Sequence, residues 1–160
     1  MMQDTLLAAQ EFRVHVKGTP KPGGSKRAFL VRQKGTGRMV PVITDANPNA
    51  KEWKQELKYT IRQEYHGKPM EGPLKLVVEF VMPRLKSHLT SAGEVKPSAP
   101  YYHIVKPDGL KLRRLIEDAM TSIVYHDDAQ ICQGWEEKHY GETPGVTITV
   151  SRLTPGGDEA

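Results

Sequence analysis

Four aspartates and several cations lie in residues 106–130, which read KPDGLKLRRLIEDAMTSIVYHDDAQ. Asp108 precedes an amphipathic segment, and Asp127 and Asp128 follow it. Carboxylates are ligands that Mg²⁺ prefers, commonly with phosphate oxygens of a substrate completing the coordination. A metal held in this way assists displacement at phosphorus. The stretch therefore indicates a metal-dependent site that cuts a phosphodiester backbone. The alternative is a solvated helix with a polar cap and an Asp-rich turn.

The cations beside Asp108 suit contacts to phosphate. Arg114, on the polar face of the expected helix, could hold a phosphate through two parallel hydrogen bonds; the alternative is an i,i+4 ion pair with Asp118. Asp108 itself could equally cap the helix, because Asp is a preferred residue at that position. Leu110 points about 160° from the apolar face, at 100° per residue, so we expect an exposed leucine there. The remaining candidates for DNA contacts in this stretch are Lys106, Lys111 and Arg113.

Positive charge is concentrated in two blocks of the 160-residue chain, although its formal net charge is only +4. Residues 13–38 hold eight Lys and Arg and no acid, and residues 84–114 hold seven Lys and Arg against two acids. Blocks of this kind suit a polyanionic partner, and the loop KPGGSKR could place Lys26 and Arg27 on DNA phosphates. The alternative is a pair of solvated basic loops.

Hydrophobic periodicity predicts alternating strands and helices. Strands are expected at 12–16, 28–32, 39–44, 74–82, 129–140 and 146–153, and helices at 48–65 and 108–123. Asn47 is the expected cap of the first helix, with Pro48 in its first turn. The order predicts an α/β or α+β fold in which two main helices pack on one face of a small mixed sheet.

The expected core includes one face of each helix, and its members are Ala50, Trp53, Leu57, Ile61, Leu112, Leu115, Ile116, Ala119, Met120 and Ile123. A single domain is expected over residues 11–153, between a disordered lead at 1–10 and a disordered tail at 154–160. Within it, residues 84–106 form a long basic loop in which Tyr101 and Tyr102 could stack on unpaired bases or simply pack locally.

The single cysteine, Cys132, excludes an internal disulfide and favours a reducing cytoplasm. Because it falls within an expected strand, we predict a buried side chain. No apolar run is long enough to span a membrane, and no motif indicates a small-molecule substrate.

Several of these segments together resemble a known family. KPD, the helix ending in EDAM, HDDAQI and GETPGVTITV look like the RusA family of Holliday-junction resolvases, common in prophages, and KSH and VKPSAPYYH are similar to its phage members. The resemblance covers roughly residues 12–153. It implies a homodimeric endodeoxyribonuclease that uses Mg²⁺, or Mn²⁺ in its place, to resolve four-way DNA junctions in recombination and repair.

The resemblance also assigns residues. It implies that Asp108 and Asp128 are the first and third acids of the family's metal site, and that Arg114 holds the position of its lysine. The second acid is replaced by Leu110, and Asp127, adjoining Asp128, is the substitute that we expect as a metal ligand. Two hypotheses follow: an active nuclease, or a junction-binding protein of the same fold whose cleavage is impaired by Leu110.

Overall fold

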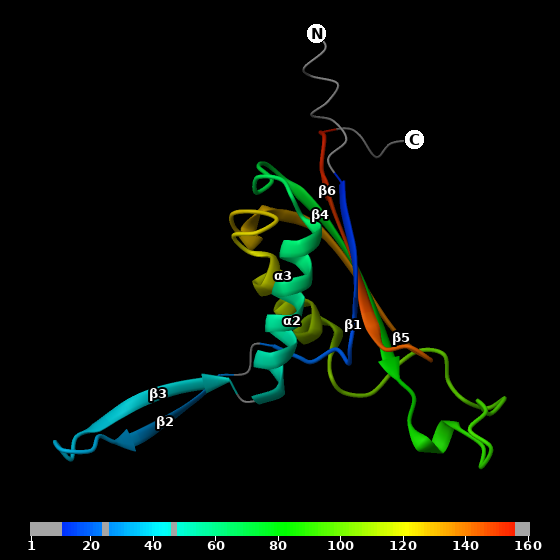
Figure 1. Cartoon of the computed structure of the whole chain (residues 1–160), viewed down its shortest axis with the longest axis horizontal. Helices are drawn as coiled ribbons and strands as arrows, with labels where there is room; N and C mark the ends of the chain where they lie inside the picture. Colours follow the sequence, from blue (N-terminus) through cyan, green and yellow to red (C-terminus); the bar gives the residue numbers. More distant parts are fainter. Residues whose placement is uncertain (1–10, 24–25, 46–47, 156–160) are drawn as a thin grey trace, which may run out of the picture.

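The computed structural model describes residues 11–23, 26–45 and 48–155; for residues 26, 27, 44, 45 and 48 the backbone alone is described. The expected cap Asn47 and the expected disordered lead lie outside the described residues, as does most of the tail. The fold is mixed α and β, with two helices against a four-stranded sheet (Figure 1), as the sequence predicted.

The sheet has the order β1–β6–β4–β5. Its strands are β1 (Glu11–Lys17), β4 (Leu74–Pro83), β5 (Ile131–Gly141) and β6 (Gly145–Arg152). β6 pairs antiparallel with both β1 and β4, whereas β5 pairs parallel with β4. The sheet is therefore mixed, and β5 lies at one edge. Antiparallel neighbours can be joined by a tight turn, but the parallel pair needs a long crossover, which residues 84–130 supply.

Helices α2 (Pro48–Glu64) and α3 (Gly109–Met120) cover one face of the sheet. The expected apolar faces are confirmed, because Trp53, Leu57, Leu112 and Ile116 are all buried. They meet alternate residues of β4, of which Leu74, Leu76, Val78, Phe80 and Met82 are buried. The residues between these, among them Glu79, project from the opposite face of the sheet because side chains alternate along a strand.

α3 is shorter than predicted: it ends at Met120 instead of continuing to residue 123. The Thr121 hydroxyl and the Tyr125 hydroxyl both donate to the Glu117 carbonyl, at 2.9 and 2.8 Å. Ser122 then takes a positive φ of 70°. The turn lets Val124 and Tyr125 enter the core, while Ile123 is only half-buried against it.

The predicted hairpin is a separate two-stranded ribbon, β2 (Lys26–Arg32) and β3 (Met39–Asp45), which projects from the body of the molecule (Figure 1). Gln33 donates its N–H to the Arg38 carbonyl and accepts from Gly37, so the tip has a defined turn. Gly35 and Gly37 adopt positive φ there, a conformation that glycine tolerates without a steric cost.

The prediction that Cys132 is buried was wrong. Cys132 lies on the edge strand β5 with its side chain exposed, and its Sγ is 3.5 Å from the Gln130 carbonyl oxygen. The position does not bury a small residue because β5 is an edge strand of the sheet, and its residues 132–135 are all exposed.

The connection at 84–106 has defined structure. It contains the short 3₁₀ helix η1 (Lys86–His88), and its end pairs with the edge of β5 through Tyr102 and His139. Arg84 donates to the Pro100 carbonyl at 2.9 Å. No described helix has the length and apolar character needed to cross a membrane.

Candidate functional site

Asp108 stands at the N-cap position of α3 with an extended backbone (φ −69°, ψ 143°). Its carboxylate accepts no capping hydrogen bond from the helix; the Asp108 main-chain carbonyl instead accepts from Leu112 N at 3.1 Å. The side chain is 63% exposed, and Lys111 Nζ lies 3.8 Å from Oδ2. The carboxylate is thus not used to complete the helix, and it remains accessible to a ligand beside the positive end of the helix dipole.

A residue that the sequence did not reveal, Lys138 of β5, holds the segment that leads into α3. Lys138 Nζ donates to the carbonyls of Val105 and Pro107 at 2.7 and 2.8 Å. Burial lowers the pKa of Lys138, and the nearby Asp108 charge partly opposes that effect. No local signal could have predicted this role, because the partners lie some thirty residues away on a different element.

Leu110 is 70% exposed, as expected from its place on the helix. It offers no oxygen to a metal. The sheet presents Glu136 of β5 to this turn: a Cβ built on Gly109 would lie 3.4 Å from Glu136 Cγ. The first turn of α3 therefore has a neighbouring acid, but it comes from the strand.

Arg113 joins that strand to the helix. Its Nη1 donates to Glu136 and its Nε to Glu117, both at 3.0 Å, and all three side chains are mostly buried. Burial works against the charge, but the bonds to Glu136 and Glu117 outweigh it and raise the pKa of Arg113. Gly134 makes room, because a Cβ there would collide with the guanidinium.

The other predicted cations stay at the surface. Arg114, Lys106 and Lys111 are exposed, and the expected pair between Arg114 and Asp118 is absent from the described ion pairs. The loop before β2 contacts α3, since Gly23 N–H donates to the Lys111 carbonyl at 3.0 Å. Lys26 and Arg27 begin β2, with side chains outside the described set. DNA contact by these five residues and by Arg113 stays a prediction.

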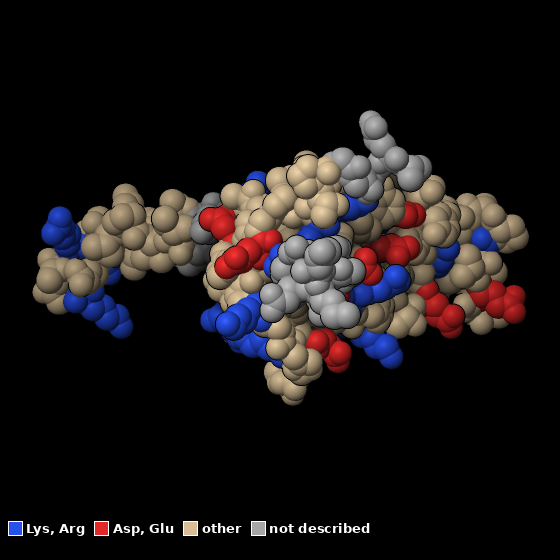
Figure 2. Space-filling model, turned by 90° about the horizontal axis from the view of Figure 1, so that it is seen from above, with Lys and Arg blue, Asp and Glu red and all other residues tan. Residues whose placement is uncertain are grey.

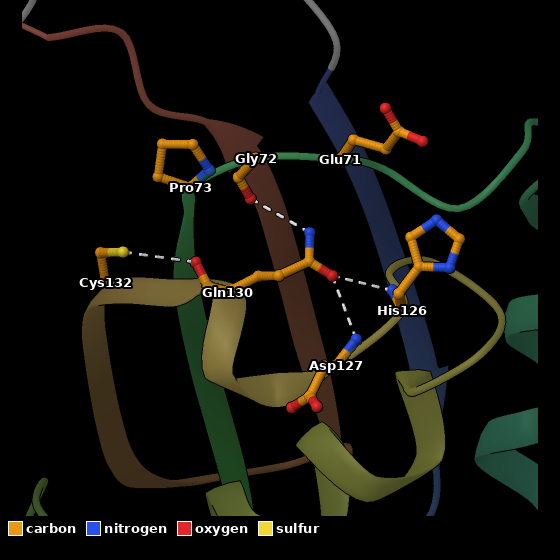
Figure 3. A pocket seen from close by; sticks show the side chains of 7 residues that line it. All are labelled: Glu71, Gly72, Pro73, His126, Asp127, Gln130 and Cys132. Atoms are coloured by element: carbon orange, nitrogen blue, oxygen red, sulfur yellow. Dashed lines mark hydrogen bonds between the residues drawn. The ribbon is translucent and has the colours of Figure 1, made fainter.

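Asp127 and Asp128 belong to a second, tightly organised turn, the 3₁₀ helix η2 (Asp128–Gln130). Asp127 Oδ1 accepts from Ala129 N at 2.8 Å, so this aspartate is the true cap. Gln130 Oε1 accepts from the N–H groups of His126 and Asp127, while its Nε2 donates to the Met70 and Gly72 carbonyls. Figure 3 shows Gln130 between residues 71–73 and residues 126–127, and these residues line a hollow of about 490 Å³.

The pKa values of the two carboxyls of this turn are shifted in opposite directions. The Ala129 N–H and a hydrogen bond with Asp128 lower the pKa of Asp127. The same hydrogen bond, together with slight burial and the Asp127 charge, raises the pKa of Asp128. Both groups are exposed. A divalent cation bound beside the pair would favour the ionised form of both carboxylates.

The structure does not gather all of the predicted ligands around one point. Asp128 lies near the second half of α3, where its charge helps burial to raise the pKa of Glu117. Asp108 is at the other end of a helix that rises 1.5 Å per residue. Among the described residues, no trio of ligand atoms within 4.8 Å includes either aspartate. Metal binding by Asp108, Asp127 and Asp128 stays a prediction.

One trio does satisfy that criterion, within the described residues: Glu79 of β4 with Glu137 and His139 of β5. Glu79 and Glu137 are register partners in the parallel pair. The trio faces away from the helices, and the Tyr101 ring stacks on His139 with centroids 5.0 Å apart. Carboxylate and imidazole are competent ligands for a divalent metal, although this trio is remote from the aspartates on the helix side.

An exposed carboxylate at a helix start, a second carboxyl pair and surrounding cations on a mixed α and β fold define the kind of site expected of a nuclease. The family model described as endodeoxyribonuclease RusA matches residues 19–151. The chain therefore belongs to the RusA family, whose members are endodeoxyribonucleases of the Holliday-junction resolvase type. A search of curated proteins found no match.

Proposed function

We propose that this protein is a divalent-metal-dependent endodeoxyribonuclease that nicks four-way DNA junctions during recombination and repair. It would act in the cytoplasm as a homodimer. The observation that carries the proposal is the Asp108 carboxylate: it stands exposed at the start of α3 and makes no capping bond. In a family of endodeoxyribonucleases, an acid spared from a structural role is a candidate for chemistry.

The carboxyl pair of η2 fits a hard cation such as Mg²⁺ or Mn²⁺. Mg²⁺ is usually bound by one or two carboxylates, with substrate phosphates and water completing the shell, and Asp127 and Asp128 are close enough to shift each other's pKa. When bound, the ion would activate a water and offset charge on the phosphate. Asp108, at the other end of α3 beside Lys111, would be a ligand of a second ion.

The cations would bind the DNA backbone. Arg114 has no partner among the described residues and is exposed on α3, so its guanidinium is available to a phosphate through paired hydrogen bonds. Lys106 flanks Asp108 in the chain and adds positive charge where the phosphoryl group becomes more negative. Arg113, already bound to Glu117 and Glu136, would instead hold α3 against β5.

A second function is favoured by Leu110. This exposed side chain occupies the family's second acid position. Among the described residues, no trio of possible metal ligands contains Asp108 or Asp128. A protein with these features could bind a junction through its basic surfaces and cut it slowly or not at all. The two functions share the fold and the DNA and differ only in metal-dependent cleavage.

The test is cleavage of an end-labelled four-way junction with Mg²⁺ or Mn²⁺ by wild type, Asp128→Asn and Leu110→Asp. Paired nicks that are lost in Asp128→Asn would support the nuclease. Tight binding without nicks, and cleavage gained by Leu110→Asp, would support the impaired binder. Absence of junction binding would refute both.

Metal binding needs its own control, because Glu79, Glu137 and His139 offer a second set of ligands. Mn²⁺ titrations of Asp128→Asn and Glu137→Gln separate the two. We expect Asp128→Asn to lose both cleavage and the Mn²⁺ that supports it. Glu137→Gln should leave the cleavage rate within about twofold of wild type.

A further inference from the structure

The β2–β3 arm, residues 26–45, is an element whose exposed composition the site above does not explain. Apolar side chains lie on both of its faces. Strand alternation and the register put Leu30, Met39 and Ile43 on one face, exposed by 63%, 51% and 67%, and Phe29 and Val31 on the other, exposed by 48% and 39%. An isolated two-stranded ribbon is marginally stable in water at best. We therefore expect a partner to cover both faces of the arm when the protein functions.

The far end of the arm is basic. Arg32, Lys34 and Arg38 are all exposed around the turn, and residues 26–44 contain no acid. Figure 2 shows Lys and Arg at this end and no Asp or Glu along the projecting length in that view. The charge at the tip complements a polyanion, which argues against an apolar protein surface as the partner.

We propose that the arm enters the branch point of branched DNA. Its basic tip would bind backbone phosphates, and its apolar side chains would lie against the base-pair faces that a branch exposes. A duplex groove would cover one broad face of a ribbon, whereas a branch point offers base pairs on both sides. Apolar side chains that insert at base steps are a known means of opening DNA. This inference rests on the proposed function, because it needs the chain to bind branched DNA.

The first test measures insertion. A four-way junction carrying 2-aminopurine beside the branch point is titrated with protein in EDTA, so that binding occurs without cleavage. Wild type should raise the fluorescence at least about twofold as the bases unstack. The double variant Phe29→Ser, Leu30→Ser should still bind but lose most of the rise. Tyr59→Ser is the matched control, because Tyr59 is 68% exposed on α2.

The second test measures phosphate contacts. Each contact contributes about 0.9 to the slope of log affinity against log salt. The triple variant Arg32→Gln, Lys34→Gln, Arg38→Gln should therefore flatten the slope by up to about 2.7, which is roughly 500-fold in affinity at 0.1 M salt. The matched control exchanges three exposed cations of the body, Lys51→Gln, Arg62→Gln and Lys68→Gln, and should change the slope by less than about 1.

Three results would overturn the inference. An arm variant that matches wild type in fluorescence and salt slope would show that the arm does not touch the branch. Variants that sediment at half the mass of wild type would make the arm a clasp between two copies of the chain. If wild type itself fails to bind the junction, the proposed function fails and the arm inference fails with it. A linear duplex of the same sequence distinguishes branch binding from general DNA binding.

Discussion

We expect Gln130→Ala to lower the free energy of unfolding by about 2–3 kcal/mol. Gln130 Oε1 accepts from His126 N and Asp127 N at 2.9 and 3.0 Å, and its Nε2 donates to the Met70 and Gly72 carbonyls at 2.9 and 3.1 Å. A hydrogen bond contributes a net 0.5–1.5 kcal/mol or so. The low end applies, because only the bond to Met70 is partly buried, and four bonds at about 0.6 give the figure.

Urea and thermal unfolding measure the loss. A chain of this size loses about 2–4 °C of Tm per kcal/mol, so Gln130→Ala should melt about 5–10 °C below wild type. Gln133→Ala is the control, since Gln133 is exposed on β5 and its side chain makes no hydrogen bond among those described; surface changes of this kind stay within about 0.5 kcal/mol.

The same variant should also cleave more slowly at a temperature where it is fully folded, because Gln130 holds the turn that carries Asp127 and Asp128. If Gln130→Ala costs no more than Gln133→Ala, the amide does not join the two segments, and the reasoning about the turn is refuted.

Arg113→Met should destabilise the protein by about 2 kcal/mol at pH 7. This is less than the 3–5 kcal/mol typical of a broken buried pair, because Glu117 and Glu136 are 18% and 24% exposed. Urea unfolding measures the loss, and the idea fails if adding Glu117→Gln restores none of the lost stability. Asp127→Asn should keep the cap on Ala129 but lower the pKa of Asp128, because Asp127 now raises it; carboxyl NMR titration should show the midpoint fall, and an unmoved midpoint would contradict the coupling. A raised folded pKa means that Asp128 favours folding less as pH rises from the unfolded value through the folded one, so in Asp127→Asn the part of this pH dependence that is due to Asp128 should weaken. Lys138→Met should speed amide exchange in residues 106–112 at least tenfold, because two carbonyls lose their donor; exchange no faster than wild type would show that the lysine does not order the segment.

Local pattern predicted what local forces determine. Trp53, Leu57 and Ile61 recur at helical spacing, and burial of that face is enough to place α2. The alternation in 74–82 likewise identified the strand β4. The end of α3 was missed because it depends on a competition for the Glu117 carbonyl, in which Tyr125 takes part from beyond the turn.

The site was predicted less completely, because its geometry is tertiary. The sequence identified Asp108, Asp127 and Asp128 as chemically significant, but it did not show that Asp127 is committed to capping while Asp108 is not. Lys138 and Gly134 could not be identified from the sequence, since one supports a loop across the fold and the other only leaves space for Arg113. Exposure of Cys132 depends on β5 being an edge strand, which no residue near it encodes.

The parallel pairing of β4 with β5 has a consequence for when activity can arise. Parallel strands form only after the intervening chain has been closed into a loop, and such non-local contacts form slowly. Asp108 and Asp128 both lie inside that connection, and Lys138 and Glu136, which organise its start, lie on the closing strand. During synthesis the helices and the β2–β3 arm can form first, while the carboxylates remain unassembled until residue 141 has been made. The pairing of β5 with β4 therefore sets when Asp108 and Asp128 reach the positions that the proposed function needs, and we expect a chain that ends before β5 to lack the proposed activity.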